Sequence, residues 1–321
     1  MTSKVNLLIT GGLGFIGSNF INYIFPKGIY KIIVIDNLIN CGSIDLIDIS
    51  IQKDSDFIFV NGSINDVSLV TITLTTYNIT KILHLASTQF QPIYEGLLVE
   101  YVQNNVMNLT TFLNTCLDYG NIELFIHMST IDTSPNTTKT LDSVITSKTC
   151  YHEYYFSKQM GDQIVVLYRD KFKLPIVIAA SNYIFGETQC LPAQVPTMLT
   201  HLNNNEKIPV RVNNVHLGNY LYINNVNTAY EILLIKATVG KVYQIVADSD
   251  GLYTQLSLAK ELIKKYTGTE DYVKWIDFIN ENECIEDETS IDNCLMKDLG
   301  WSPGTSTSYG LSIMVNYYKN L

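Results

Sequence analysis

The stretch Leu7–Asn19, LLITGGLGFIGSN, decides the fold. The apolar strand Val5–Ile9 runs into a turn with glycines at Gly11, Gly14 and Gly17, and an apolar helical pattern follows the turn. Glycines at this spacing are typical of a dinucleotide-binding turn. The first permits a tight turn, the second lets a pyrophosphate approach the backbone, and the third lets the helix pack closely against the strand. The helix N-terminus then offers free N–H groups to the anion.

An acidic residue follows at the distance that such a turn requires. The second apolar strand, Lys31–Asp36, ends at Asp36, about twenty residues after Gly17. A carboxylate at this position accepts hydrogen bonds from the adenosine ribose of a dinucleotide. A turn that merely needs glycines is the alternative interpretation, and the order strand, turn, helix, strand argues against it.

The bulk composition limits the classes of partner. The chain has 321 residues, 46% hydrophobic content and a net charge of −10, which argues against a nucleic-acid-binding protein because such a protein needs a basic face. No run of about 18 apolar residues occurs, so we expect no transmembrane helix and no membrane partner. Glycines interrupt the N-terminal apolar stretch, so we expect no secretory signal and a cytoplasmic protein.

Cysteine and arginine usage adds two expectations. The six cysteines are scattered and form no CxxC motif: Cys41, Cys116, Cys150, Cys190, Cys284 and Cys294. We therefore expect no metal site, no disulfide framework and a reducing compartment. Arginine, the usual bidentate partner of phosphate, occurs only at Arg169 and Arg211.

Strands and helices alternate through the first half of the chain. Further apolar strands are expected at Phe57–Val60, Lys81–Ala86, Leu124–Ser129 and Leu174–Ala180. Helices are expected at Val67–Tyr77, Leu97–Tyr119 and Glu153–Lys171. This alternation predicts an α/β fold with a doubly wound parallel sheet, the Rossmann fold, whose ligands bind at the carboxyl ends of the strands.

The pattern changes after about Asn182, where prolines and polar turns become frequent. We predict that residues 1–180 form the dinucleotide-binding domain, to which a returning segment near 220–246 adds the strand Val242–Ile245. Residues 181–219 and 247–321 are predicted to form a smaller C-terminal domain that binds the substrate as a lid.

Tyr154 and Lys158, in the sequence YYFSK, are the strongest candidates for catalysis. Residues four apart share one face of a helix. An ammonium beside a phenol favours the phenolate and lowers the pKa of the phenol toward working pH. Tyr151 and Tyr155 lie nearby, but of the three only Tyr154 has a lysine four residues on. An ordinary tyrosine–lysine pair on a helix surface is the alternative.

With these motifs, the chain resembles the extended short-chain dehydrogenase/reductase superfamily, and within it the nucleotide-sugar 4,6-dehydratases and their 4-epimerase relatives. The resemblance spans nearly the whole chain. The segments that carry it are TGGLGFIGSN, IDNL, the strand end HLA, Asn104–Asn105, Met128–Thr130, YYFSK, Ser181–Gly186, Tyr220–Asn225 and LGWSP.

The resemblance implies NAD as the cofactor, in preference to NADP, because Asp36 disfavours a 2′-phosphate and Asn37 adds no positive charge. The cofactor-binding residues that it implies are Gly11, Gly14, Phe15, Ile16, Gly17, Asp36, Asn37, Ser63, Ile64, Leu85, Ala86 and Lys158. It implies a UDP- or dTDP-hexose as substrate, with Thr130, Asn182 and Arg211 as binding residues. It also implies a homodimer, in which Leu97–Tyr119 and Glu153–Lys171 pair across the interface as a four-helix bundle.

The resemblance also assigns the catalytic roles. Thr130 binds the sugar 4-hydroxyl, Tyr154 takes its proton as hydride leaves C4 for NAD, and Lys158 orients the nicotinamide ribose. In a 4,6-dehydratase, a glutamate then removes the proton on C5 and an aspartic acid protonates the departing 6-hydroxyl. The family's Thr-Asp-Glu triplet reads Thr130-Ile131-Asp132 here, so Ile131 cannot donate a proton and Asp132 is the remaining candidate base.

Other departures affect the substrate half of the site. The polar Glu-Ser-His stretch of the family reads Thr88-Gln89-Phe90, and Gly218 and Glu288 stand where phosphate-binding arginines are expected. His152 and Glu153, just before Tyr154, are candidate replacements for the missing acid.

Three functions therefore remain open. The first is a nucleotide-sugar 4,6-dehydratase with an altered acid/base pair. The second is a 4-epimerase or 4-ketoreductase, which needs no carboxylate pair. The third is a non-catalytic protein that keeps the fold for binding or assembly.

Overall fold

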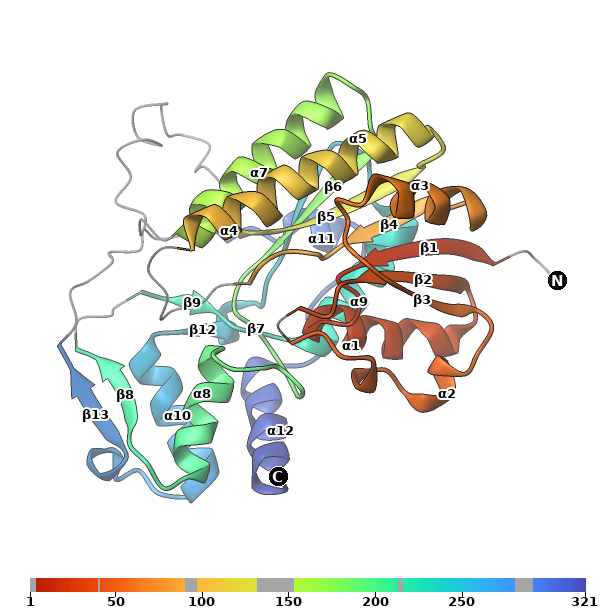
Figure 1. Cartoon of the computed structure of the whole chain (residues 1–321). Helices are drawn as coiled ribbons and strands as arrows, with labels where there is room; N and C mark the ends of the chain where they lie inside the picture. Colours follow the sequence, from red (N-terminus) through yellow and green to blue (C-terminus); the bar gives the residue numbers. More distant parts are fainter. Residues whose placement is uncertain (1–3, 40, 90–96, 132–152, 213–215, 281–290) are drawn as a thin grey trace, which may run out of the picture.

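A seven-stranded parallel sheet forms the centre of the computed structural model (Figure 1). The structure describes residues 4–39, 41–89, 97–131, 153–212, 216–280 and 291–321. The strand order is β11-β6-β5-β4-β1-β2-β3. The strand order reverses between β1 and β4, and ligands of doubly wound sheets bind outside the carboxyl ends of the strands at such a reversal.

The strands of this sheet lie where the apolar runs predict them. Their bounds are β1 (Val5–Thr10), β2 (Tyr30–Asp36), β3 (Phe57–Asn61), β4 (Lys81–His84), β5 (Leu124–Thr130), β6 (Ile176–Ser181) and β11 (Val242–Ile245). The register aligns Thr10 with His84 and Thr130 with Ser181, so polar residues of neighbouring strands meet at the carboxyl edge. The predicted α/β fold with a doubly wound parallel sheet is confirmed.

Helices cover both faces of the sheet. On one face, α3 (Val67–Thr76), α5 (Leu109–Tyr119) and α7 (Glu153–Asp170) share an apolar cluster with the sheet. On the other face, α1 (Phe15–Ile24) packs against α9 (Ile223–Lys236), where the Phe20 and Tyr230 rings meet edge to face at 5.8 Å. These two layers account for the near-continuous burial of β1 and β2.

The C-terminal half adds three two-stranded sheets. They pair β7 (Ile184–Phe185) with β10 (Leu221–Tyr222), β9 (Gly218–Asn219) with β12 (Leu252–Tyr253), and β8 (Ile208–Arg211) with β13 (Ile276–Ile279). The longer helices here are α8 (Gln194–Asn203), α10 (Gln255–Thr267) and α12 (Thr307–Lys319). One apolar cluster runs from Phe20 in α1 to Met314 in α12. The division into two domains at the stated bounds stays a prediction.

Short helices complete the connections. They are η1 (Phe25–Lys27), η2 (Ile44–Leu46), α2 (Ile49–Gln52), α4 (Leu98–Val102), η5 (Ser249–Gly251), η6 (Tyr272–Lys274) and α11 (Cys294–Asp298). Across the described ranges, no helix has the length and apolar character needed to cross a bilayer.

The helix predicted at Leu97–Tyr119 is interrupted by a π-helical segment, η3 (Gln103–Asn108). Asn105 in this segment is buried. Its side-chain oxygen accepts hydrogen bonds from the Ser87 hydroxyl at 2.9 Å and the Thr88 N–H at 2.8 Å, and its amide donates to the Ser157 hydroxyl at 3.0 Å. The extra residue of a π turn commonly marks a functional position. Here the hydrogen bonds of Asn105 join the loop after β4 to α7.

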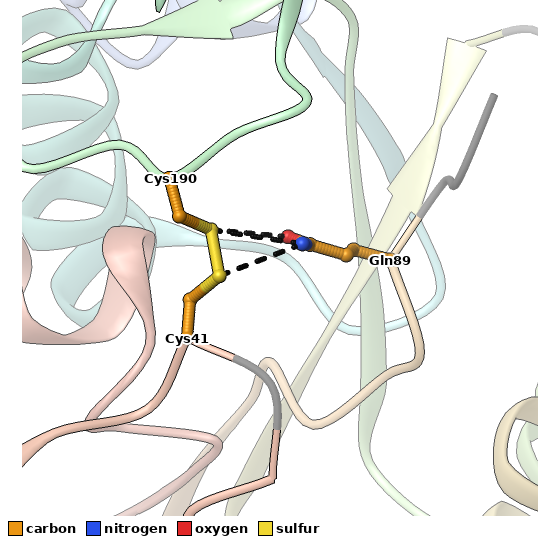
Figure 2. The surroundings of a disulfide bond; sticks show 3 residues. All are labelled: Cys41, Gln89 and Cys190. Atoms are coloured by element: carbon orange, nitrogen blue, oxygen red, sulfur yellow. Dashed lines mark hydrogen bonds between the residues drawn. A yellow bond between two sulfur atoms is a disulfide. The ribbon is translucent and has the colours of Figure 1, made fainter. Parts of the chain in front are cut away.

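The cysteine expectation is wrong in one respect. Cys41, in the loop after β2, forms a disulfide with Cys190, in the loop after β7, with a Cα–Cα distance of 6.3 Å (Figure 2). The two cysteines are 149 residues apart, so no local motif announces the bond. The topology brings them together, and the absence of a CxxC motif was therefore no argument against pairing or for a reducing compartment. Within the described residues, the free cysteines are buried Cys116 and exposed Cys294.

The packing of α7 on the π segment predicts a stability effect at Gly161. A Cβ atom there would lie 2.8 Å from the Asn105 carbonyl oxygen, which is backbone and cannot rotate away. We expect Gly161→Ala to lower the free energy of unfolding by about 1–2 kcal/mol, because overpacking outweighs the gain in helix propensity. The matched control is Gly304→Ala, where a Cβ atom meets nothing within 4 Å. Equal urea-unfolding midpoints for the two variants would contradict this account of the contact.

Candidate active site

The glycine turn lies directly against the end of β4. Gly11 has a φ of +66°, and a Cβ atom there would lie 2.8 Å from the backbone of Ala86. The Leu85 N–H donates to the Thr10 carbonyl at 3.0 Å, and the Ala86 N–H to the Thr10 hydroxyl at 3.4 Å. The predicted cofactor residues Gly11, Leu85 and Ala86 therefore lie together at the carboxyl edge.

The start of α1 is closely packed at Gly17 and more open at Gly14. A Cβ atom at Gly17 would lie 2.5 Å from Gly12 Cα, so this glycine permits close packing. A Cβ atom at Gly14 would meet only the Gly11 carbonyl oxygen, at 3.4 Å. Gly14 precedes the helix and has no side chain with which to cap it. The N–H groups of Phe15 and Ile16 therefore follow an open turn, as an anion site at a helix N-terminus requires.

Asp36 connects this turn to the loop after β2. Its carboxylate is buried and accepts the Leu13 N–H and the Leu38 N–H, each at 2.9 Å. Each carboxylate oxygen has a second lone pair. Asp36 can therefore also accept from ribose hydroxyls. The neighbouring Asn37 is exposed, and its side-chain oxygen accepts the Ile39 N–H at 3.2 Å.

Ser63 and Ile64 lie beside Asp36, after the end of β3. The Gly62 N–H donates to the Asp36 carbonyl at 3.0 Å, which holds this loop to the end of β2. Ile64 is buried in the apolar cluster under α3. All the described residues predicted to bind the adenosine half of a dinucleotide thus lie at or after the carboxyl ends of β1, β2, β3 or β4.

Tyr154 and Lys158 share one face of α7, as predicted. Lys158 is buried, and its ammonium donates to the Met128 carbonyl at 2.8 Å. This bond anchors α7 to β5 two residues before Thr130. Tyr154 lies one turn nearer the helix start, and its ring packs edge to face on Tyr101 at 5.8 Å. The tyrosine therefore lies near the carboxyl end of β5.

A buried polar network that the motifs do not reveal supports Lys158. Asp162, one turn further along α7, accepts from the Ser129 hydroxyl at 2.5 Å, and its other carboxylate oxygen lies 3.1 Å from His127 Nε2. The His127 ring stacks on His84 at 5.5 Å, and His84 Nδ1 lies 2.7 Å from the Thr10 hydroxyl. This network runs through the core from the glycine turn to α7.

Burial sets the charge states of this network. It lowers the pKa of Lys158, and the Asp162 carboxylate opposes that shift. It raises the pKa of Asp162, but the hydrogen bond and charge of His127, together with Lys158, outweigh burial and hold this pKa below its usual value. Burial also lowers the pKa of His84 and of His127. An ionised Asp162 is therefore the anionic partner that favours the charged form of Lys158.

The structure describes two residues of the Thr130-Ile131-Asp132 triplet, which begins at the last residue of β5. Thr130 ends the strand and is buried. Ile131 is 1% exposed and packs with Ala180 and Val246 in a small apolar cluster. Asp132 lies outside the described residues, as do His152 and Glu288. Position 131 is thus a packing position with no proton to donate.

The predicted substrate residues separate into two places. Asn182 follows β6 and is buried, and its side-chain oxygen accepts the Tyr183 N–H at 2.9 Å. Arg211 is exposed at the end of β8, in a different sheet, and its backbone N–H donates to the Gln255 side-chain oxygen at 3.1 Å. Within the described part of the chain, no group of three or more His, Cys, Asp and Glu side chains can hold a metal ion.

Comparison with known proteins identifies the family of the chain. The sequence pattern of the NAD dependent epimerase/dehydratase family matches residues 7–246. The chain belongs to this family. The dTDP-D-glucose 4,6-dehydratase of Dictyostelium discoideum is 26% identical, and the alignment covers 98% of this chain and 81% of that protein.

Solved structures share the fold. The crystal structure of dTDP-glucose 4,6-dehydratase from Bacillus anthracis, in complex with NAD, has a TM-score of 0.83 at 24% identity and covers 98% of this chain and 97% of that one. UDP-glucuronic acid 4-epimerase from Bacillus cereus, in complex with UDP-glucuronic acid and NAD, has a TM-score of 0.83 at 21% identity, with 98% and 99% coverage. At these identities the likeness establishes the fold alone.

The buried histidines of this family member predict a pH effect on stability. His84 and His127 have folded-state pKa values below their ordinary 6.5, so each takes up a proton on unfolding at pH values between the two. Their contribution to the free energy of unfolding is complete above pH 6.5 and is lost as the pH falls toward their folded-state pKa values. We expect the free energy of unfolding to drop between pH 7 and 5.5, by up to about 1.4 kcal/mol per pH unit for each histidine.

Urea unfolding at pH 7 and 5.5 measures this slope, and His84→Gln should reduce it by the share of one histidine. A variant that keeps the full slope would show that His84 does not contribute.

Proposed function

We propose that this protein is an NAD-dependent enzyme that oxidises and re-reduces the sugar of a UDP- or dTDP-hexose, by the chemistry of the nucleotide-sugar 4,6-dehydratases and 4-epimerases. The observation that carries the proposal is the position of Tyr154 and Lys158. The Lys158 bond to the Met128 carbonyl sets this pair beside the end of β5, at the same sheet edge as Gly11 and Asp36.

The residues present fit NAD. The open backbone at Gly14 suits a pyrophosphate, and the buried Asp36 carboxylate suits ribose hydroxyls and repels a 2′-phosphate. When bound, NAD supplies the hydride acceptor. Ser63 and Ile64 would lie by the adenine, and Leu85 and Ala86 along the cofactor. Lys158 would hold the nicotinamide ribose.

The chain's own groups then move the proton. Thr130 would bind the sugar 4-hydroxyl, and Tyr154, as a phenolate favoured by the Lys158 ammonium, would take the hydroxyl proton while hydride leaves C4. Asn182, buried after β6, would help to hold the sugar nucleotide. The resulting 4-keto sugar is the common intermediate of both reaction classes. Arg211 remains the candidate for the diphosphate.

The apolar packing of Ile131 bears on the choice between a 4,6-dehydratase and a 4-epimerase or 4-ketoreductase. Loss of water across C5–C6 needs an acid for the 6-hydroxyl, and Ile131 sits buried with Ala180 and Val246. The curated relative at 26% identity supports the 4,6-dehydratase, with an acid supplied from elsewhere in the chain. The buried isoleucine favours the second candidate, a 4-epimerase or 4-ketoreductase, which needs no such acid.

One preparation tests these candidates. The purified protein is denatured to release and quantify bound NAD, and the native protein is incubated with UDP-glucose and dTDP-glucose. A 4-keto-6-deoxy product, identified by loss of water in mass spectrometry, supports the dehydratase. A galactose epimer without loss of water supports the epimerase. Bound NAD, or none, with no turnover of either sugar nucleotide would leave a binding or assembly role.

The role of Tyr154 is tested by substitution. We expect Tyr154→Phe to lower kcat by about 10²–10⁴-fold, because the group that accepts the hydroxyl proton is gone, while NAD content stays unchanged. Tyr155→Phe is the matched control, since this neighbouring tyrosine has no lysine four residues on, and it should keep the wild-type kcat. Equal activity of the two variants would refute the assignment.

A further inference from the structure

The disulfide Cys41–Cys190 joins two loops that are far apart in the sequence (Figure 2). Both loops contact residues at or just before the start of α1. The loop with Cys41 follows Asp36, and the two residues after Cys41 contact the glycine turn and Asp36. The Ser43 N–H donates to the Leu13 carbonyl at 3.1 Å, and a Cβ atom at Gly42 would lie 3.1 Å from the Asp36 carboxylate. This loop therefore borders the position proposed for the adenosine ribose.

The loop with Cys190 reaches the same helix from the opposite half of the chain. A Cβ atom at Gly186 would lie 3.3 Å from the Phe15 ring, and the Asn19 amide donates to the Thr188 hydroxyl at 3.4 Å. Phe15 and Asn19 belong to the first turns of α1. The hydrogen bond from Asn19 to this loop is long, whereas the disulfide links the loop covalently to the loop after β2.

Gln89 connects this disulfide to the catalytic helix. Its side-chain amide lies 3.8 Å from Cys41 Sγ and 3.6 Å from Cys190 Sγ (Figure 2). Its backbone carbonyl accepts the Tyr101 hydroxyl at 3.2 Å, and the Tyr101 ring packs on Tyr154. The loops after β2, β4 and β7 thus converge on one covalent bond at the carboxyl edge of the sheet.

We propose that Cys41–Cys190 is a reversible redox site, a clasp that holds the two loops over the bound dinucleotide when oxidised and releases it when reduced. The inference rests on the proposed NAD site. With the bond intact, the loop after β2 cannot move away from the loop after β7, so the ligand leaves slowly. With the bond reduced, the loop around Cys190 opens locally, because a bond between positions 149 residues apart no longer restrains it.

The chemistry is thiol–disulfide exchange with a dithiol. One thiolate of the dithiol attacks Cys41 Sγ or Cys190 Sγ, and a mixed disulfide forms as the other cysteine leaves as a thiolate. The second thiolate of the reagent closes its own disulfide and releases the remaining cysteine. Two electrons and two protons pass from the dithiol to the protein. Both cysteines are half-buried and within reach of a small reagent, and a low-molecular-weight disulfide reverses the reaction.

The test uses the 321-residue chain with its bound NAD. Non-reducing peptide mapping first establishes the bond. The dissociation rate of NAD is then measured by exchange against labelled NAD, before and after treatment with dithiothreitol. We expect reduction, and each of Cys41→Ser and Cys190→Ser without any reductant, to speed dissociation at least about tenfold. Cys294→Ser, which removes an exposed free thiol, is the matched control and should leave the rate unchanged.

Hydrogen exchange of the peptides that contain Cys41 and Cys190 gives a second readout, independent of NAD. Faster exchange in both peptides after reduction supports the clasp. Absence of the linked peptide, or equal exchange and dissociation rates in both redox states, overturns it. A protein with no bound NAD and no turnover of either sugar nucleotide would defeat the proposed function instead, and the hydrogen-exchange comparison would still decide whether the bond restrains the two loops.

Discussion

The close approach of Gly11 to Ala86 is the constraint on which the site depends. Their backbones lie so near that a single methyl group would fall 2.8 Å from Ala86 Cα. This contact joins the end of β1 to the end of β4 across the point where the strand order reverses. The hydrogen bonds from Leu85 and Ala86 to Thr10 fix the same junction. The glycine turn therefore cannot shift without moving the loop after β4, which leads to Gln89 and η3.

A second set of contacts fixes the catalytic helix against this frame. Gly161 lets α7 approach Asn105, and Lys158 ties the helix to the Met128 carbonyl. The first contact joins α7 to η3 and the second joins α7 to β5, so together they fix the position of α7 relative to both elements. These contacts also position Tyr154, which lies one helical turn before Lys158. The ionised Asp162 beneath this pair completes the arrangement by offsetting the burial of the lysine charge.

Much of this was predictable because it depends on local patterns. The strands of the main sheet, the glycine turn, Asp36 and the Tyr154–Lys158 pair each follow from spacing along a short stretch. The π turn at η3 was not predictable in this way, since one extra residue leaves the apolar spacing of the predicted helix nearly unchanged. Asp162 does carry a signal, because it lies four residues after Lys158 on the same helix face, but a lone acidic residue on a helix is more often solvated.

Features that depend on contacts between distant parts of the chain could not be predicted from the sequence. The disulfide joins loops that no motif relates, and the short paired strands such as β8 and β13 have too few residues for a clear pattern. The sequence did mark Ile131 as a chemical departure. The apolar cluster around Ile131 could be seen only once β5, β6 and the segment after β11 were assembled.

That cluster limits the substitutions that position 131 can accept. A carboxyl group introduced at position 131 would be placed among Ala180 and Val246, where an unpaired charge is strongly unfavourable. An acid at this position alone would thus destabilise the fold unless polar neighbours were introduced with it. An engineered proton donor for this site is better placed at another position.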